Sequence, residues 1–265
     1  MPISFGMPAL IEAPSLTQSL AIAKELGLNF VEINSNLPIY RLDKVDLEAM
    51  QDEIANSGLQ VTLHLEEYLH LTDLDERVRK QYQEILKQEI IAAKYLGLPV
   101  LNLHLLDGVK YTLPDRVVHV FDVYETDFQQ GVQELLDICE DTIGGAPMLI
   151  AIENLNGYNM SVKNAIAHLL TSPVFTLTWD VGHDICAQGA DKDYLSKYEH
   201  RIKHMHLHDA LLPNRPHLTL GEGCVDLDSC LRLADKNNMS CVVEVKHLHS
   251  LRQSVSWLRT HAYLD

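Results

Sequence analysis

Several features that mark secreted and membrane proteins are missing from this sequence of 265 residues. Its start, MPISFGMPALIEAPS, lacks the charged beginning and apolar run of a signal peptide, and no stretch approaches the roughly 18 apolar residues of a membrane span. The five cysteines form no Cys-x-x-Cys pair and are odd in number, so we expect free thiols in a reducing compartment. These absences predict a soluble, cytoplasmic protein with no membrane partner.

Positive charge is also scarce. The chain has 21 lysines and arginines against 37 aspartates and glutamates, which gives a net charge of −16. Nucleic-acid binding normally begins from a basic patch, so a nucleic-acid partner is the less favoured interpretation. With 46% hydrophobic residues, however, the chain can bury a sizeable core.

Glycine motifs for nucleotide binding are absent, but glycine has a regular place in the chain. No Gly-x-Gly-x-x-Gly motif follows the first strand pattern, and no P-loop occurs anywhere. In residues 23–33, 54–65 and 93–105, a helical pattern stops at a glycine, a leucine follows, and an apolar strand pattern begins. Such a glycine typically ends a helix in the left-handed conformation, which we predict for Gly27, Gly58 and Gly97.

The same rhythm continues along the chain and predicts eight strands. They lie near Ile3–Met7, Phe30–Asn34, Gln60–Leu65, Val100–Leu105, Met148–Asn154, Phe175–Val181, Ile202–His208 and Cys241–Lys246. Strands that alternate with helices imply parallel pairing through right-handed crossovers. Eight such units match the size of an α/β protein with the (β/α)8 TIM barrel fold, about 250 residues, and an open doubly wound sheet is the alternative. We expect residues 1–265 to form one barrel domain.

The clearest helical pattern covers Asp75–Gly97. Apolar residues recur there at helical spacing, and the predicted apolar face includes Val78, Tyr82, Ile85, Ile90 and Leu96.

Polar residues stand where six consecutive strands end, which is where a TIM barrel gathers its functional groups. From the third strand to the eighth, these positions hold His64, His104, Glu153, Asp180, His183, His206, His208 and Glu244. So many acids and imidazoles on one rim would repel one another or stay protonated unless a divalent cation balanced them. The combination therefore predicts a metal site, whereas His64 or Glu153 alone would more often be a hydrogen-bonded structural residue.

Two observations bear on the choice of ligands. Glu153 and Glu244 each follow apolar residues, and a carboxylate is rarely buried unless it is paired or bound to a cation. Along the seventh strand, His204, His206 and His208 share one face because side chains alternate. We choose His206 as the ligand because it lies just before the strand gives way to a loop. A core-facing His204, and a His208 that orients the substrate or supports a ligand, remain open alternatives.

Five short motifs give the chain a family resemblance. They are ENLNG at the fifth strand, WDVGH at the sixth, MHLHDA at the seventh, HLTLGEG in the following loop, and VVEVK at the eighth. With them, nearly the whole chain resembles the xylose isomerase-like barrel superfamily. That superfamily holds sugar and sugar phosphate isomerases and epimerases together with the AP endonucleases of family 2. The resemblance implies one metal site formed by Glu153, Asp180, His206 and Glu244.

The two branches of this superfamily imply different uses of the neighbouring residues. In the isomerase and epimerase branch, the two glutamates would also act as acid and base on opposite faces of a bound sugar, and His183 would contact substrate oxygens. In the endonuclease branch, His64, His104 and Glu153 would hold a second metal.

A third metal in the endonuclease branch would need His183, His217 and an aspartate two residues before His217, where this chain has Arg215. Arginine stays protonated and cannot bind a metal. Its guanidinium could instead bind a phosphate or carboxylate of the substrate, and a solvent-facing Arg215 is the alternative. We take His183, Arg215 and His217 as the expected substrate-binding residues.

The favoured prediction is a metal-dependent isomerase or epimerase that acts on a small sugar, a sugar phosphate or a related hydroxy-ketone. A Mn, Mg, Co or Zn ion would bind the substrate oxygens. One of Glu153 and Glu244 would remove a proton to give an enediolate, and the other would return it.

Two alternatives remain at this point. One is a zinc phosphodiesterase of abasic DNA, with His64 and His104 at a second metal. The other is a non-catalytic barrel that binds a carbohydrate. We also expect a homodimer, because that assembly is common among enzymes.

Overall fold

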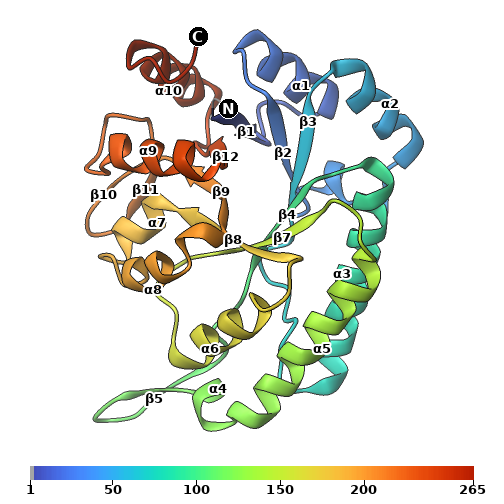
Figure 1. The fold of residues 1–265 in the computed structure, drawn as a ribbon, viewed down its shortest axis with the longest axis vertical. Coiled ribbons are helices and arrows are strands. Elements are labelled where there is room, and N and C mark those ends of the chain that lie inside the picture. The colour runs from blue at the N-terminus through green and yellow to red at the C-terminus, as the bar shows by residue number, and fades with distance from the viewer. Residues whose placement is uncertain (1–2) are drawn as a thin grey trace.

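A computed structural model describes residues 3–265 and shows a barrel surrounded by helices (Figure 1). Eight parallel strands close in the order β1-β12-β9-β8-β7-β4-β3-β2. They are β1 (Ser4–Pro8), β2 (Phe30–Asn34), β3 (Gln60–His64), β4 (Val100–His104), β7 (Leu149–Glu153), β8 (Phe175–Asp180), β9 (Ile202–Leu207) and β12 (Ser240–Val243). The predicted (β/α)8 TIM barrel is confirmed.

The predicted strands lie where the structure has them, with one difference in length. Seven agree with the observed bounds to within one residue at either end. The eighth, β12, ends at Val243 instead of Lys246. The reason is a tight turn, in which the N–H of Val245 donates to the carbonyl of Val243 at 3.0 Å.

The outer layer consists of helices that follow the strands in turn. They are α1 (Leu16–Glu25), α2 (Leu47–Ser57), α3 (Glu76–Leu96), α4 (Val120–Val123), α5 (Glu125–Ile143), α6 (Met160–Leu169), α7 (Val181–Cys186), α8 (Lys192–Lys197), α9 (Leu227–Asn237) and α10 (Leu248–Thr260), with 3-10 turns at Pro38–Tyr40 and Glu199–Arg201. The two longest, α3 and α5, pack side by side (Figure 1). Within residues 3–265, none of these helices has both the length and the apolar character that a membrane span requires.

Capping residues explain where several helices begin and end. The carboxylates of Asp46 and Asp75 accept backbone N–H groups in the first turns of α2 and α3. Gly58 and Gly97 end the same helices with φ of 72° and 71°, and Gly27 follows α1 with φ of 71°. These left-handed values suit glycine, so the predicted glycine caps are confirmed.

The predicted apolar face of α3 is only partly right. Ile90 and Leu96 are buried and Tyr82 is half-buried, but Val78 and Ile85 are 37% and 41% exposed. The assignment of Val78 and Ile85 to the buried face is therefore wrong.

The true buried face of α3 includes three polar side chains, Arg79, Gln83 and Glu89. The guanidinium of Arg79 donates to Glu134 of α5 at 2.8 Å, and the amide of Gln83 donates to the carbonyl of Leu71 at 3.0 Å. Buried polar groups are tolerated when they are hydrogen-bonded. Because these partners come from other parts of the chain, the helical spacing of apolar residues could not reveal this face.

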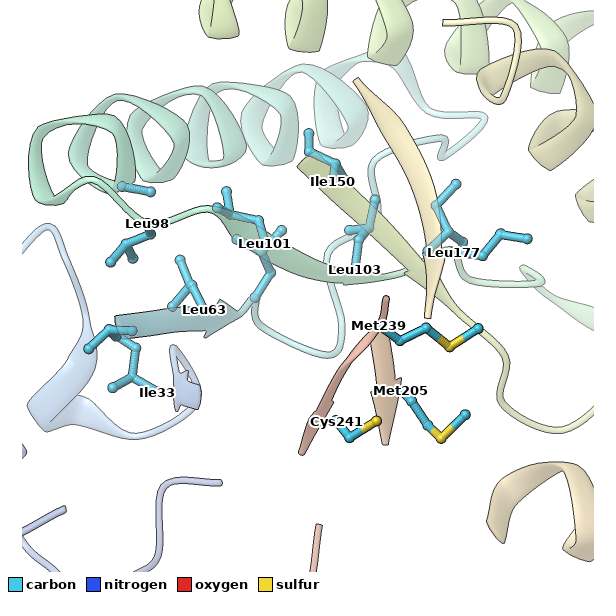
Figure 2. Packing of buried hydrophobic residues seen from close by; sticks show 14 of the residues in the cluster. Ile33, Leu63, Leu98, Leu101, Leu103, Ile150, Leu177, Met205, Met239 and Cys241 are labelled. Atoms are coloured by element: carbon cyan, nitrogen blue, oxygen red, sulfur yellow. The ribbon is translucent and has the colours of Figure 1, made fainter. Parts of the chain in front are cut away.

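The apolar core lies between the barrel and the helices, and the barrel lumen is polar. Leu63, Leu101, Leu177 and Met205 belong to the buried apolar cluster (Figure 2). Side chains alternate along a strand, so the residues next to them point into the lumen. There, the hydroxyl of Thr178 in β8 donates to Asn102 in β4 at 2.5 Å, although β7 lies between these two strands. The lumen therefore holds polar groups that must satisfy one another.

Two short hairpins project from the loops of the barrel and were not predicted. β5 (Lys110–Thr112) pairs with β6 (Val117–His119), and β10 (Asp209–Leu211) pairs with β11 (Arg215–Leu218). The second hairpin follows β9 directly. It carries two of the predicted substrate-binding residues, Arg215 and His217. The five cysteines are free thiols, as expected.

Candidate metal centre

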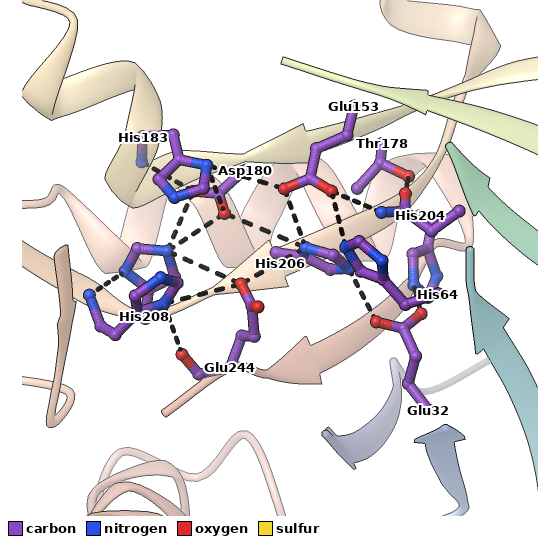
Figure 3. Close-up of polar contacts among 12 residues, drawn as sticks. Glu32, His64, Glu153, Thr178, Asp180, His183, His204, His206, His208 and Glu244 are labelled. Carbon is purple, nitrogen blue, oxygen red and sulfur yellow. Dashed lines mark hydrogen bonds and ion pairs between the residues drawn. The ribbon is translucent and has the colours of Figure 1, made fainter. Parts of the chain in front are cut away.

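Four strands bring one ligand each to the carboxyl end of the barrel. Glu153 ends β7, Asp180 ends β8, His206 lies near the end of β9, and Glu244 follows β12 directly. Each offers a nitrogen or carboxylate oxygen, and these atoms lie within 4.8 Å of one another. All four residues are buried. The structure thus brings together the four residues that the sequence resemblance had implied as one metal site (Figure 3).

The ring of His206 points its Nδ1 atom at three carboxylates. This atom lies 3.1 Å from Glu153, 3.3 Å from Glu244 and 3.9 Å from Asp180. Burial alone would lower the pKa of His206, but the charges of Glu153 and Glu244 outweigh it and hold this pKa well above its ordinary value. Burial likewise opposes ionisation of both glutamates, yet the charge of His206 holds their pKa values well below the ordinary range.

The donor set of this cluster fits a divalent cation. Three carboxylates and one imidazole converge in a buried space, and carboxylates packed this closely repel one another without positive charge between them. One oxygen of Glu244, Oε2, is buried and has no hydrogen-bond partner in the part of the chain that the structure describes. A buried carboxylate oxygen without a partner is costly, and a bound cation would satisfy it.

Other side chains orient the carboxylates of the cluster. The amide of Asn102 donates to Oε2 of Glu153, and Nζ of Lys246 donates to Oε1 of Glu244 at 2.7 Å. These contacts occupy one oxygen of each glutamate and leave the other directed at Nδ1 of His206.

A second group lies beside the first, formed by His64, His104 and Glu153. Nε2 of His64 is 3.4 Å and Nε2 of His104 is 3.0 Å from the same oxygen of Glu153. Nδ1 of His64 is 2.8 Å from the carbonyl of Leu65, so this nitrogen carries the proton and Nε2 keeps a free lone pair in the neutral ring. His64 and His104, the predicted ligands of a second metal, therefore lie where a second ion could share Glu153 with the first.

A third group, formed by His183, His208 and His217, is less open to a metal. Nδ1 of His208 accepts the backbone N–H of His217 at 2.8 Å, and Nε2 of His208 lies 3.0 Å from Asp180. Both nitrogens of His208 are thus in use, and the residue orients Asp180. Burial lowers the pKa of His217 to about 4, so this ring is neutral at pH 7.

Arg215 occupies the exposed edge of the β10–β11 hairpin. Across residues 3–265, its guanidinium has no hydrogen bond or ion pair. His183 and His217 lie closer to the cluster: Nδ1 of His183 is 3.2 Å from Asp180, and Nδ1 of His217 is 3.7 Å from Glu244.

One residue of the lumen, Glu32 in β2, escaped the sequence analysis. Its carboxylate contacts both His204 and His206 at 2.9 Å (Figure 3). The available signal was the one already applied to Glu153 and Glu244, because Glu32 stands between Val31 and Ile33 in a buried strand. A carboxylate in such a place must be paired.

Comparisons with known proteins show the family and the fold of the chain. The sequence model of a family described as xylose isomerase-like TIM barrel matches residues 20–261. L-ribulose-5-phosphate 3-epimerase UlaE from Salmonella heidelberg is 27% identical over 244 residues, which cover 87% of this chain and 81% of that protein.

Solved structures share the fold. A D-tagatose 3-epimerase-like protein superposes with a TM-score of 0.78 at 20% identity, covering 98% of this chain and 97% of its own. The IolI protein with a bound zinc atom superposes with a TM-score of 0.71 at 15% identity, covering 98% and 96%.

Proposed function

Because the chain belongs to the xylose isomerase-like TIM barrel family, we propose that it is a divalent-metal-dependent isomerase or epimerase. Its substrate would be a small sugar, a sugar phosphate or a related hydroxy-ketone. One observation carries the proposal: two buried glutamates, Glu153 and Glu244, approach the same nitrogen of His206 from different strands, at 3.1 and 3.3 Å. The names of the relatives support it, since they include epimerases of L-ribulose 5-phosphate and of D-tagatose type.

The chain's own residues supply the binding and proton-transfer steps. Glu153, Asp180, His206 and Glu244 would hold a Mn, Mg, Co or Zn ion, which when bound would polarise a substrate carbonyl and acidify the adjacent C–H bond. Either glutamate would then take this proton on a carboxylate oxygen, and the electron pair would remain on the substrate as an enediolate. The other glutamate, which would carry a proton in the substrate complex, would give it to the opposite face of the same carbon for epimerisation, or to the neighbouring carbon for isomerisation, and the first glutamate would release its proton to water after the product leaves.

We assign the remaining polar groups at the rim to substrate binding. His183 and His217 stand beside the cluster, and His217 is neutral at pH 7, so it can donate or accept a hydrogen bond from a sugar hydroxyl. Arg215 keeps its guanidinium free for a phosphate or carboxylate, which it can bind with two parallel hydrogen bonds.

A zinc phosphodiesterase of abasic DNA is the second candidate function. The group of His64, His104 and Glu153 favours it, because a second ion sharing Glu153 would give a binuclear site. Against it stand the net charge of −16, Arg215 in the place of an aspartate, and the engaged nitrogens of His208.

The test is the metal content of the protein purified without added metal, by elemental analysis, together with Glu244→Gln. Glu222→Gln is the matched control, because Glu222 is an exposed glutamate in a nearby loop. We expect about one divalent ion per chain in the wild type and the control, and loss of the ion in Glu244→Gln. A panel of ketoses with and without phosphate in D2O should then show deuterium entering beside the carbonyl, with a rate about 10²–10⁴-fold lower in Glu244→Gln.

Two outcomes would contradict the proposal. Two or three zinc ions per chain together with cleavage of an abasic-site oligonucleotide would put the phosphodiesterase first. If no metal binds even after reconstitution with Mn, Mg, Co and Zn, the proposed metal site does not exist.

A further inference from the structure

We infer that Glu32 is a positioning residue that fixes the tautomer and orientation of His206, so that the Nδ1 lone pair of His206 faces the candidate metal centre. This inference rests on the proposed function, because it concerns how the chain prepares one ligand of that site. Glu32 lies in β2, on the far side of the lumen from the four ligands' strands.

The carboxylate of Glu32 joins two histidines of β9. Its Oε1 atom is 2.9 Å from Nε2 of His206, and its Oε2 atom is 2.9 Å from Nε2 of His204. The hydroxyl of Thr62 in β3 donates to the same Oε2 at 3.2 Å. All of these side chains are buried, so water does not compete for the contacts.

The protons of this group can be assigned from its partners. The hydroxyl of Ser240 lies 2.6 Å from Nδ1 of His204, and this nitrogen accepts from it if His204 carries its own proton on Nε2. An ionised Glu32 then accepts from Nε2–H of His204 and from Thr62, and its Oε1 atom lies in ion-pair contact with Nε2 of His206. The negative charge of Glu32 at 2.9 Å favours a proton on Nε2 of His206, so a cation can take the place of a proton on Nδ1.

The position of this proton on Nε2 determines the state of Nδ1, the other nitrogen of the His206 ring. When a cation takes the place of the Nδ1 proton, His206 keeps its other proton on Nε2 beside Glu32 and offers the cation a lone pair at Nδ1, the atom that lies 3.1 Å from Glu153 and 3.3 Å from Glu244. A lone pair among carboxylates is unfavourable alone and favourable around a cation. Carboxylates that fix metal-ligating histidines in this way typically change metal affinity by about 10–100-fold when they are removed.

The first experiment measures zinc affinity of the metal-free protein by competition with a chelating dye. Glu32→Gln keeps the size of the side chain, but its amide offers one acceptor and one donor group. One of the two histidine nitrogens then meets a donor, so we expect zinc to bind about 10–100-fold more weakly. Glu32→Asp should fall between this variant and the wild type.

Glu89→Gln is the matched control, because Glu89 is also a buried glutamate, and within residues 3–265 the hydroxyl of Ser35 is the one hydrogen-bond donor to its carboxylate. Its zinc affinity should equal that of the wild type. Equal affinity in Glu32→Gln and the wild type would overturn the inference. A wild type that binds no divalent ion would instead overturn the proposed function, so the two failures are distinguishable.

A second measurement needs no variant. Long-range ¹H–¹⁵N NMR spectra of the zinc-loaded wild type report which ring nitrogen of each histidine carries the proton. We expect His206 to be protonated at Nε2 and zinc-bound at Nδ1. The reverse assignment would show that Glu32 does not set the tautomer.

Discussion

Each buried carboxylate of the lumen has a nitrogen partner of its own. Glu153 accepts from Asn102, Asp180 lies against His208, and Glu244 accepts from Lys246. Breaking one partner of a buried ion pair typically costs about 3–5 kcal/mol, because the remaining charge is left without compensation. The site can therefore concentrate negative charge because each acid is anchored on one side and open on the other.

Glu89 in α3 is a buried acid that has no nitrogen partner within residues 3–265. Burial raises the pKa of Glu89 from 4.5 to about 7. The folded state then binds more protons than the unfolded state between these pH values, so this residue's contribution to stability is lost as pH rises through that window.

We therefore predict that Glu89→Gln stabilises the protein at pH 8 and has little effect at pH 5. The free energy of unfolding should rise by up to about 3 kcal/mol at pH 8. Urea denaturation followed by circular dichroism at both pH values measures this difference. The same difference at pH 5 and pH 8 would show that Glu89 does not titrate between them.

For single residues, the sequence revealed the acids and histidines at strand ends but not the side chains that form hydrogen bonds and ion pairs with them. Glu153, Asp180, His206 and Glu244 were among the candidates because they lie near the ends of apolar strands, and the family resemblance implied them as one set. Glu32 could not be linked to His206, because these residues are 174 positions apart and meet only after the barrel closes. Arg79 and Gln83 on the buried face of α3 were missed for the same reason.

Among the elements, α7 matters because it places His183 and contacts the ring of His208. A Cβ atom at Gly182 would lie 2.0 Å from Cε1 of His208. The ring is buried and held by Asp180 and by the backbone of His217, so it has little room to move. Glycine at position 182 therefore permits the close approach of α7 to this histidine.

Gly182→Ala should destabilise the protein by about 1–3 kcal/mol, as overpacking in a buried site does. Thermal unfolding monitored by calorimetry measures this loss of stability. In a His208→Ala background the clash is absent, so the same substitution should cost much less. An equal cost in both backgrounds would mean that the two residues do not compete for space.

The segment after β9 is held by Asp209. Its carboxylate accepts the backbone N–H groups of Ala210 at 2.9 Å, Gly221 at 2.9 Å and Val225 at 3.0 Å. These bonds tie both ends of the segment that carries Arg215 and His217. The hairpin is thus anchored by one buried acid.

Asp209→Asn replaces one acceptor oxygen by an amide that faces backbone N–H groups. We expect a loss of about 2–4 kcal/mol in stability and faster hydrogen exchange at Gly221 and Val225. Hydrogen–deuterium exchange with mass spectrometry measures the second effect, with the exposed Asp193→Asn as control. Unchanged exchange in the 210–225 region would argue against the anchor.

Most elements were predictable from periodicity, and the exceptions share a physical cause. The barrel strands are apolar and buried, so their patterns are strong. The β5–β6 and β10–β11 hairpins have strands of three or four residues whose side chains are mostly exposed or half-buried. Such strands form because the loops are held in place by the barrel, and no alternation of apolar residues marks them.

For the whole molecule, a bound metal should act as a stabilising ligand. A ligand that binds only the folded state at 100 times its Kd adds about 2.7 kcal/mol. For a chain of this size, that corresponds to a rise in Tm of roughly 5–10 °C. We predict this shift on adding zinc to the metal-free protein, measured by calorimetry. A similar rise in the Tm of Glu244→Gln would show that zinc binds at another site.

The pairing that seals the barrel joins its first strand to its last. Ser4 of β1 pairs with Ser240 of β12, so β1 keeps an open edge until β12 has left the ribosome. Contacts between residues this distant in sequence slow folding, and a strand edge that stays unpaired during that time can pair with another chain and cause aggregation. All four candidate ligands lie between residues 153 and 244, in the part synthesised late. A newly made chain would therefore become able to bind the ion at the moment when its barrel closes. A chain shortened before β12 would neither close its barrel nor bind the ion.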